Sequence, residues 1–160
     1  METRIYTKPI LVIPGRRLTE LPADIHLYTN LQKLDCNCNN LTHLDNLPQS
    51  LKELWCYSNN ITQLDNLPQN LEYLYCNNNK LIHLNNLPQN LKELDCENNN
   101  ITQLDNLPLN LKILRCNNNK ITKLNNLPQN LKKLNCKDNP LEYDFEPILS
   151  NIRNYITSIG

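Results

Sequence analysis

The chain has 160 residues, enough for one domain, and its 16 basic and 16 acidic side chains give a formal net charge of zero. A neutral chain exerts no long-range attraction on nucleic acids or anionic membranes, so neither is expected as its partner. Only two glycines are present, which excludes a glycine-rich loop for binding phosphate.

The N-terminal segment predicts a cap on the structure that follows. The apolar stretch in METRIYTKPILVIPG is about six residues long, too short for a secretory signal, and nothing approaches a membrane span. We therefore expect an intracellular, cytoplasmic protein with reduced thiols and no cofactor. Within the cap, residues 1–30, the segment ILVIPGRRLTELPADIHLYTN is predicted to be a diverged repeat with Leu18, Leu21 and Ile25 facing inward.

From Leu31 onward the sequence repeats every twenty residues without a gap. Five blocks are complete, such as LKELWCYSNNITQLDNLPQN, and a sixth changes halfway. The shared pattern is LxxLxCxxNx[LI]xxLxxLPxx. Such a period predicts a solenoid over residues 31–140, in which each turn packs only on its neighbours.

The first half of each repeat predicts a short strand. Its second Leu and its Cys are two residues apart and share one face, so stacked copies form a parallel sheet with a continuous core. The leucine column is Leu34, Leu54, Leu74, Leu94, Leu114 and Leu134, and the cysteine column is Cys36, Cys56, Cys76, Cys96, Cys116 and Cys136.

One Asn per repeat marks the turn out of the strand. These are Asn39, Asn59, Asn79, Asn99, Asn119 and Asn139. The turn removes backbone groups from the sheet, and they need other hydrogen-bond partners. A carboxamide both donates and accepts, so a stack of them can bridge successive turns.

The second half of each complete repeat contains a proline, which rules out a regular helix there. The prolines are Pro48, Pro68, Pro88, Pro108 and Pro128. We expect an extended, polyproline-like chain on the convex side of the solenoid.

The sixth repeat loses its register after Leu141, and residues 141–160 are predicted as a C-terminal cap. Residues 146–158 are predicted to be helical, with Pro147 in the first turn. One apolar face at helical spacing consists of Ile148, Leu149, Ile152, Tyr155 and Ile156. A cap over the last core layer is favoured over a partner-binding helix.

The pattern is that of a leucine-rich repeat (LRR) with Cys where the third Leu usually stands. The twenty-residue period and the second Leu-Pro resemble the short repeat of effector proteins that Gram-negative pathogens secrete. The Asn-rich, Cys-containing form is similar to repeat proteins of giant DNA viruses of amoebae (mimivirus-like). The resemblance covers about residues 8–145 and implies a horseshoe-shaped arc with strands on its concave face. A viral protein would act in the host-cell cytoplasm.

Cysteines and histidines do not form a recognisable metal or catalytic site. The six column cysteines have core spacing rather than zinc spacing, and Cys38 lies outside the column at an exposed position. His43 and His83 occupy one exposed position two repeats apart, roughly 10 Å from each other at ordinary strand spacing. We expect neither metal binding nor catalysis.

The concave face carries the candidate binding residues. Outward strand positions are free of the repeat's structural demands, and four aromatic residues fall there on two neighbouring strands: Trp55, Tyr57, Tyr73 and Tyr75. The flanking charged candidates are Asp35, Glu53, Glu93, Asp95, Glu97 and Arg115. Further along, Lys112, Lys132, Lys133 and Lys137 join Arg115 in a basic end, so the face is graded in charge.

These residues predict a non-enzymatic scaffold that binds a protein on its concave face, because Trp and Tyr dominate interface energetics. Cross-strand packing of the aromatics is the alternative. The resembling effectors often include a ubiquitin-ligase domain, which needs more chain than follows Asn139, so a recognition arm for a separate ligase is the nearest enzyme-linked alternative. Self-assembly through exposed sheet edges, or a structural role, is another alternative, and we expect a monomer or weak self-association. Nucleic-acid binding through the basic end is least favoured.

Overall fold

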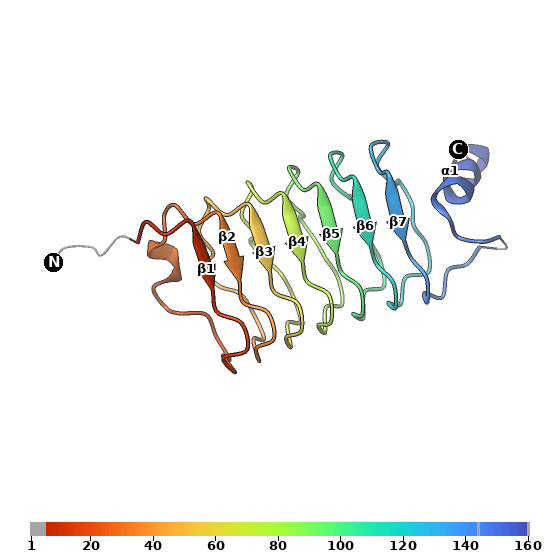
Figure 1. The fold of residues 1–160 in the computed structure, drawn as a ribbon. Helices are drawn as coiled ribbons and strands as arrows, with labels where there is room; N and C mark the ends of the chain where they lie inside the picture. Colours follow the sequence, from red (N-terminus) through yellow and green to blue (C-terminus); the bar gives the residue numbers. More distant parts are fainter. Residues whose placement is uncertain (1–5, 144, 160) are drawn as a thin grey trace.

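A computed structural model describes residues 6–143 and 145–159, and these form a solenoid built on one sheet of seven parallel strands (Figure 1). The strands follow one another across the sheet in chain order: β1 (Ile10–Val12), β2 (Lys33–Asp35), β3 (Glu53–Trp55), β4 (Tyr73–Tyr75), β5 (Glu93–Asp95), β6 (Ile113–Arg115) and β7 (Lys133–Asn135). The predicted LRR solenoid is confirmed.

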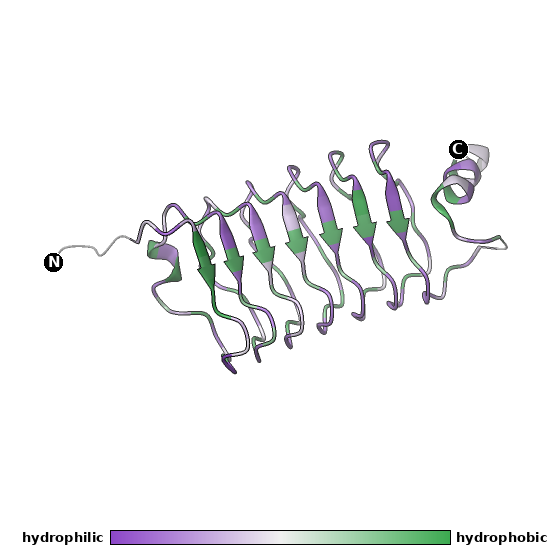
Figure 2. Ribbon diagram, in the orientation of Figure 1, coloured by the Kyte–Doolittle hydropathy of each residue, from purple (hydrophilic) through white to green (hydrophobic). Residues whose placement is uncertain are grey.

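The twenty-residue period sets the register of the sheet. Leu34 pairs with Leu54, which pairs with Leu74, so each position of the repeat forms a straight column. The leucine and cysteine columns are buried, as predicted, except that Leu134 in β7 is half-buried. The central residue of every strand is a leucine, and in β2, β5 and β7 polar residues flank it (Figure 2). Between β2 and β7 the described chain contains no helix, in agreement with the effect of its prolines.

The Asn column stabilises the turns as predicted. The Nδ2 of Asn79 donates to the carbonyl oxygens of Cys56 and Cys76, each at 3.0 Å, and its Oδ1 accepts from the backbone N–H of Ile61 at 2.9 Å. The other Asn side chains of the column repeat this arrangement. Each side chain therefore connects its own turn to the preceding one.

The abundance of asparagine has a second cause, which the sequence pattern alone did not reveal. Two positions per repeat have a positive φ, near 50°, a conformation in which glycine is favoured and asparagine is tolerated. The first follows the strand and comprises Cys38, Ser58, Asn78, Asn98, Asn118 and Asp138. The second precedes the Leu-Pro and comprises Asn46, Asn66, Asn86, Asn106 and Asn126. Asparagine thus takes the role that glycine has in many turns.

The N-terminal cap contains β1 and a short 3-10 helix, η1 (Ile25–Leu27), which the sequence had not predicted. Ile25 is 1% exposed, while Leu18 and Leu21 are half-buried against the core. The inward placement of these residues agrees with the diverged repeat. Residues 1–5 of the predicted cap lie outside the described residues.

The C-terminal cap is formed by α1 (Leu149–Ile159), which lies beyond β7 at the end of the solenoid (Figure 1). It begins three residues later than predicted, so Pro147 precedes the helix instead of lying in its first turn. Proline disfavours helical geometry at the residue before it, which here is Glu146. Residues 144 and 160 of the predicted cap lie outside the described residues.

The helix covers the last core layer mainly through Ile152, which is fully buried. Tyr155 contacts Tyr143 and Phe145, with ring centroids 5.5 Å away in each case. Ile148, predicted on the same face, is 46% exposed because it precedes the helix. In the part of the chain that the structure describes, no helix is long and apolar enough to cross a membrane.

Candidate binding surface

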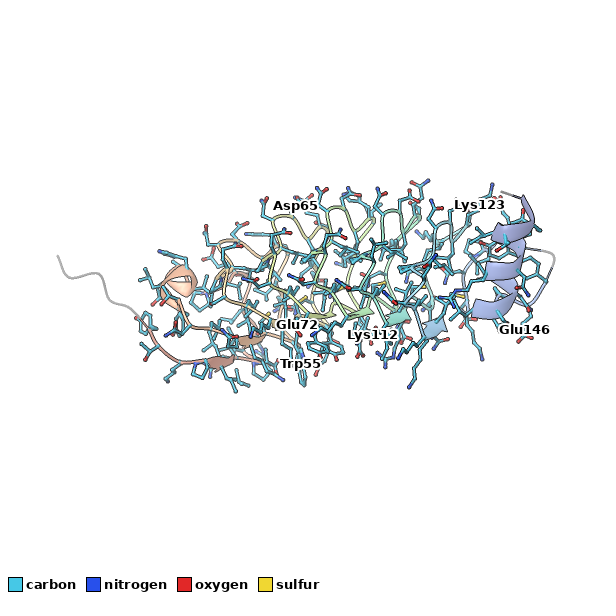
Figure 3. All side chains as sticks on the ribbon, turned by 90° about the horizontal axis from the view of Figure 1, so that it is seen from above. Trp55, Asp65, Glu72, Lys112, Lys123 and Glu146 are labelled. Atoms are coloured by element: carbon cyan, nitrogen blue, oxygen red, sulfur yellow. The ribbon has the colours of Figure 1, made fainter. Side chains whose placement is uncertain are left out.

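The outward positions of β3 and β4 bring the predicted aromatic residues together. Trp55 is the last residue of β3, and Tyr73 and Tyr75 are the first and last residues of β4. Tyr57 follows β3 by two residues, and all four side chains are half-buried. We call these four residues the aromatic patch. Trp55 lies on the strand side of the solenoid, opposite Asp65 (Figure 3).

Trp55 is held by its neighbours on the sheet. Its ring meets that of Tyr75 edge to face, with centroids 5.6 Å apart and planes at 76°. Its Nε1 donates a hydrogen bond to the Oε1 of Glu53 at 2.7 Å. The cross-strand packing that the sequence offered as an alternative is thus present for this pair.

The remaining face of the Trp55 ring contacts a cation of the same chain. The Nζ of Lys33 lies 3.4 Å from the ring centroid, and it also lies 3.2 Å from the Oε1 of Glu53. One carboxylate oxygen therefore accepts from both Trp55 and Lys33. The side chains of Lys33 and Glu53 are 24% and 30% exposed, so this arrangement borders on solvent.

The carboxylates of the candidate surface differ in their surroundings. Glu93 forms a salt bridge with Arg115, and Glu97 accepts a hydrogen bond from Asn117 at 2.9 Å. Asp35 is only 9% exposed and accepts from the Nδ2 of Asn37, so it is covered more than its place on an acidic rim suggested.

Burial raises the pKa of Asp95 above its ordinary value, although the backbone N–H of Glu97 and the charge of Arg115 oppose the shift. Burial also raises the pKa of Glu97, with a further contribution from the negative charge of Asp95. Both groups are therefore incompletely compensated as anions.

The nearby carboxylates also affect the hydroxyl of Tyr75. Burial raises its pKa to about 12, with further contributions from the charges of Glu93 and Glu53. Tyr75 thus stays protonated at neutral pH and can donate a hydrogen bond. At the other end of the face, Lys133 and Lys137 are exposed.

Three solved structures with the same architecture come from bacterial proteins. The Shigella effector LRR domain superposes with a TM-score of 0.80 at 32% identity, over 89% of this chain and 64% of that domain. YopM, a leucine-rich effector of Yersinia pestis, superposes with a TM-score of 0.76 at 38% identity, over 84% of this chain and 38% of YopM. The fold is a leucine-rich-repeat fold.

A third similar LRR structure is the functional domain of InlJ from Listeria monocytogenes, which includes a cysteine ladder. It has a TM-score of 0.71 and 31% identity, over 81% of this chain and 30% of that one. The chain thus spans less than two thirds of each of these proteins. Comparison with protein-family models and with curated proteins gives no match. The resemblance to bacterial effectors is supported in structure, and the likeness to giant-virus proteins stays a prediction.

Lys33 is the residue of this LRR surface that sequence reasoning missed. It belongs to the outward column but was not among the candidate binding residues. The signal was present, because the repeat register places Lys33 opposite Glu53 and diagonal to Trp55. Diagonal neighbours on a sheet are within reach of long side chains.

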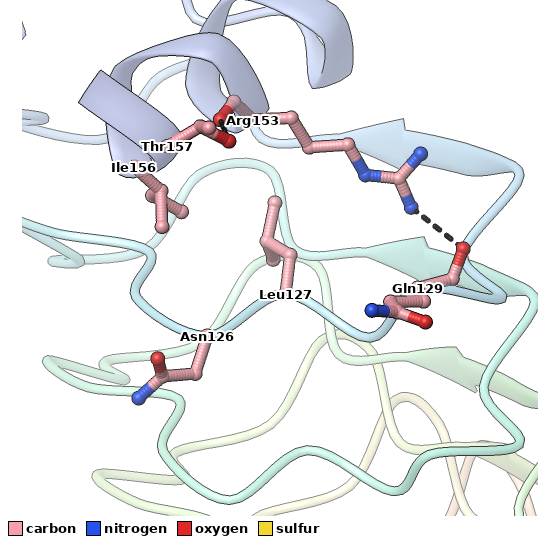
Figure 4. Close-up of a pocket in the computed structure, with 6 residues that line it drawn as sticks. All are labelled: Asn126, Leu127, Gln129, Arg153, Ile156 and Thr157. Carbon is pink, nitrogen blue, oxygen red and sulfur yellow. Dashed lines mark hydrogen bonds between the residues drawn. The ribbon is translucent and has the colours of Figure 1, made fainter. Parts of the chain in front are cut away.

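A groove lies at the other end of the LRR solenoid, between the last turn and α1. It encloses about 460 Å³ and is lined by Asn126, Leu127, Gln129, Arg153, Ile156 and Thr157 (Figure 4). Arg153 donates to the backbone oxygens of Pro128, Gln129 and Leu131 at 2.9 to 3.1 Å. These bonds attach the cap, so we assign the arginine a structural role.

Among the described residues, no group of three His, Cys, Asp or Glu side chains is arranged to hold a metal ion. The six column thiols are buried, and burial raises the pKa of each of them, which opposes formation of the nucleophilic thiolate. Cys38 is exposed. His43 lies beside Asp45, with 3.4 Å between Nε2 and Oδ2 at a solvent-exposed position.

Proposed function

We propose that this chain is a non-enzymatic scaffold that binds a protein partner on its concave face. The LRR fold supports an interaction scaffold in general, and the aromatic patch supports a specific location for it. Its four side chains stay half-exposed on β3 and β4 or just beyond β3, although the core beneath them is already complete. Clustered Trp and Tyr side chains are enriched where interfaces gain most of their free energy.

The proposed contact surface combines this patch with its charged neighbours. Besides Trp55, Tyr57, Tyr73 and Tyr75 it includes Glu53, Glu93, Asp95, Glu97 and Arg115, with Asp35 beneath its edge. Charges of both signs at the two ends of the face would set the direction in which a partner docks. The cysteines of the chain are free thiols, which supports action in a reducing compartment such as the cytoplasm.

The test is affinity capture from a cell lysate with the native chain and with Trp55→Ala/Tyr75→Ala. We expect the double variant to lose the partner, because truncating a hot spot costs about 2 kcal/mol or more of binding free energy. The matched control is Ile82→Ala/Leu109→Ala, which truncates two apolar side chains that are 54% and 71% exposed outside the strands. Loss of the partner in the control, or its retention in the double variant, would place the site elsewhere.

A second candidate function is self-association through β1. This strand is the first of the sheet and pairs only with β2 in the described chain. It is apolar along its length (Figure 2), with Ile10 and Val12 53% and 51% exposed. A free strand edge with apolar side chains favours pairing with another strand. Analytical ultracentrifugation of the native chain and of the double variant Ile10→Lys/Val12→Lys tests this. The average mass in solution should rise with protein concentration for the native chain and not for the variant.

A further inference from the structure

The ring of Trp55 is a preformed cation site that one of the chain's own lysines occupies. An aromatic face and a carboxylate meet there, since the Nζ of Lys33 lies 3.4 Å from the ring centroid and 3.2 Å from the Oε1 of Glu53. The indole N–H donates to the same oxygen and so fixes the ring against that carboxylate. The geometry selects a positive group that lies flat on the ring or points at it.

The outward positions of β5 are acidic: Glu93 and Asp95 lie in the strand and Glu97 follows it by two residues. Within the described residues, Asp95 and Glu97 form no salt bridge, while the nearby Arg115 is paired with Glu93. Burial raises the pKa of the Asp95 and Glu97 carboxyl groups, so a cation from outside would stabilise their ionised forms. Asp95 is in register with Tyr75, which is in register with Trp55. On the other side, Asp35 is in register with Trp55, so the aromatic patch has a carboxylate on each side.

We propose that the partner of the concave face is a basic segment of a protein, and that one of its arginine side chains displaces Lys33 from the Trp55 ring. This inference rests on the proposed function and deepens it by naming the chemistry of the partner. An arginine fits the site better than the resident lysine, because its planar guanidinium stacks on the indole and bonds a carboxylate through two N–H groups. Lys33 acts as an internal competitor.

The distance between strands sets the interval at which the partner's basic side chains can bind. Asp95 lies two strands from Trp55, about 10 Å away at ordinary strand spacing, which about three residues of extended chain can span. A second basic side chain at that interval reaches Asp95 and Glu97 while the first occupies Trp55. The exposed Lys133 and Lys137 repel the segment from the other end of the face.

Binding of a fluorescein-labelled hexa-arginine peptide, followed by fluorescence anisotropy at low salt, tests the proposal. We expect Lys33→Met to bind the peptide about threefold more tightly than the native chain, because the competing cation is gone and the apolar stem is kept. The matched control is Lys80→Met, which removes an exposed lysine from outside the strand face. A general effect of net charge would strengthen binding equally in both variants, and this outcome would overturn the proposal.

Two further comparisons locate the peptide. Trp55→Ala should weaken binding at least tenfold. Asp95→Asn should weaken it more than Asp65→Asn, which removes the same charge from the opposite side of the solenoid (Figure 3). A labelled hexa-glutamine peptide should not bind. Equal binding of hexa-arginine to the native chain and Trp55→Ala would refute the proposal.

The two proposals fail in different ways. One outcome is that capture of a partner depends on Trp55 and Tyr75 while binding of hexa-arginine does not depend on Trp55. That result would support the binding site on the concave face and refute the proposal that its partner is basic. If hexa-arginine binding depends on Trp55 and is enhanced by Lys33→Met, the cation site is supported independently of any captured protein.

Discussion

The Nδ2 of Asn79 lies 3.0 Å from the carbonyl oxygen of Cys56, one full turn of the solenoid earlier. This bond joins residues 23 positions apart, and equivalent bonds recur along the column of turn asparagines. The amide is 9% exposed, so water cannot easily replace the bonds it makes. The ladder thus stabilises contacts between turns, on which a solenoid depends.

Asn79→Ala is expected to lower the free energy of unfolding by about 3 kcal/mol, because it leaves the buried N–H of Ile61 without its acceptor and removes the bond between turns to the carbonyl oxygen of Cys56, which keeps only the donor from Asn59. Urea denaturation followed by circular dichroism measures the change. The control is Asn70→Ala, whose exposed side chain makes one bond, to the oxygen of Gln49. The control should cost less than about 0.5 kcal/mol. Equal losses in the two variants would contradict a special role for the ladder.

Thiol accessibility should separate Cys38 from the other six cysteines. In the folded chain Cys38 is exposed and the six column thiols are buried, so only Cys38 should react quickly with a disulfide reagent such as dithionitrobenzoate. All seven should react in urea. Cys38→Ser should abolish the fast phase without altering the slow one. Several fast-reacting thiols in native buffer would show that the column is more accessible than its burial indicates.

Alkaline pH is expected to destabilise the fold through the same thiols. Burial raises the pKa of Cys36 from 9.0 to about 12 and that of Cys136 to about 11. In the unfolded chain these groups ionise near pH 9, so the unfolded state releases protons that the folded state retains. The full stability contribution is therefore present below about pH 9 and is lost as the pH rises toward 12.

Urea midpoints measured from about pH 7 to pH 10.5 check this sign. The native chain should show a falling midpoint above pH 9. Cys36→Ala should start from a lower midpoint at pH 7, since it leaves a cavity, but should decline less steeply because one titrating group is gone. Parallel curves for the two chains would assign the alkaline loss to other groups, such as tyrosine or lysine.

The repeat unit could be derived from the sequence because each of its positions has one physical task. Leu54 and Cys56 had to face the core, Asn59 had to satisfy turn groups, and Pro68 had to prevent a helix; the structure agrees in each case. Twenty-residue periodicity also fixed the register of the strands without any knowledge of distant contacts. The fold followed because identical neighbours remove the usual uncertainty about which segments pack together.

The surface and the ends were less predictable, since their contacts occur once. The interaction of Lys33 with Trp55 depends on side-chain conformations that a column of residue types does not specify. Asp35 belonged to an outward column and is nevertheless buried beside Asn37. The start of α1 was misplaced by three residues because Pro147 is compatible with positions both inside and before a first helical turn. Each of these features occurs only once in the chain, so the repeat pattern carries no information about it.

The capping role of α1 leads to a prediction about where stability is lost. Ile152→Ala should create a cavity over the last core layer and cost about 3 kcal/mol, because Ile152 is fully buried. In a solenoid each turn stabilises only its neighbours, so amide hydrogen exchange should accelerate near β7 and much less near β3. The control is Asn154→Ala, which changes an exposed residue of the same helix and should alter neither the free energy of unfolding nor the exchange rates. Uniform acceleration from β2 to β7 would mean that the solenoid unfolds as one cooperative unit, with the cap stabilising all of its turns equally.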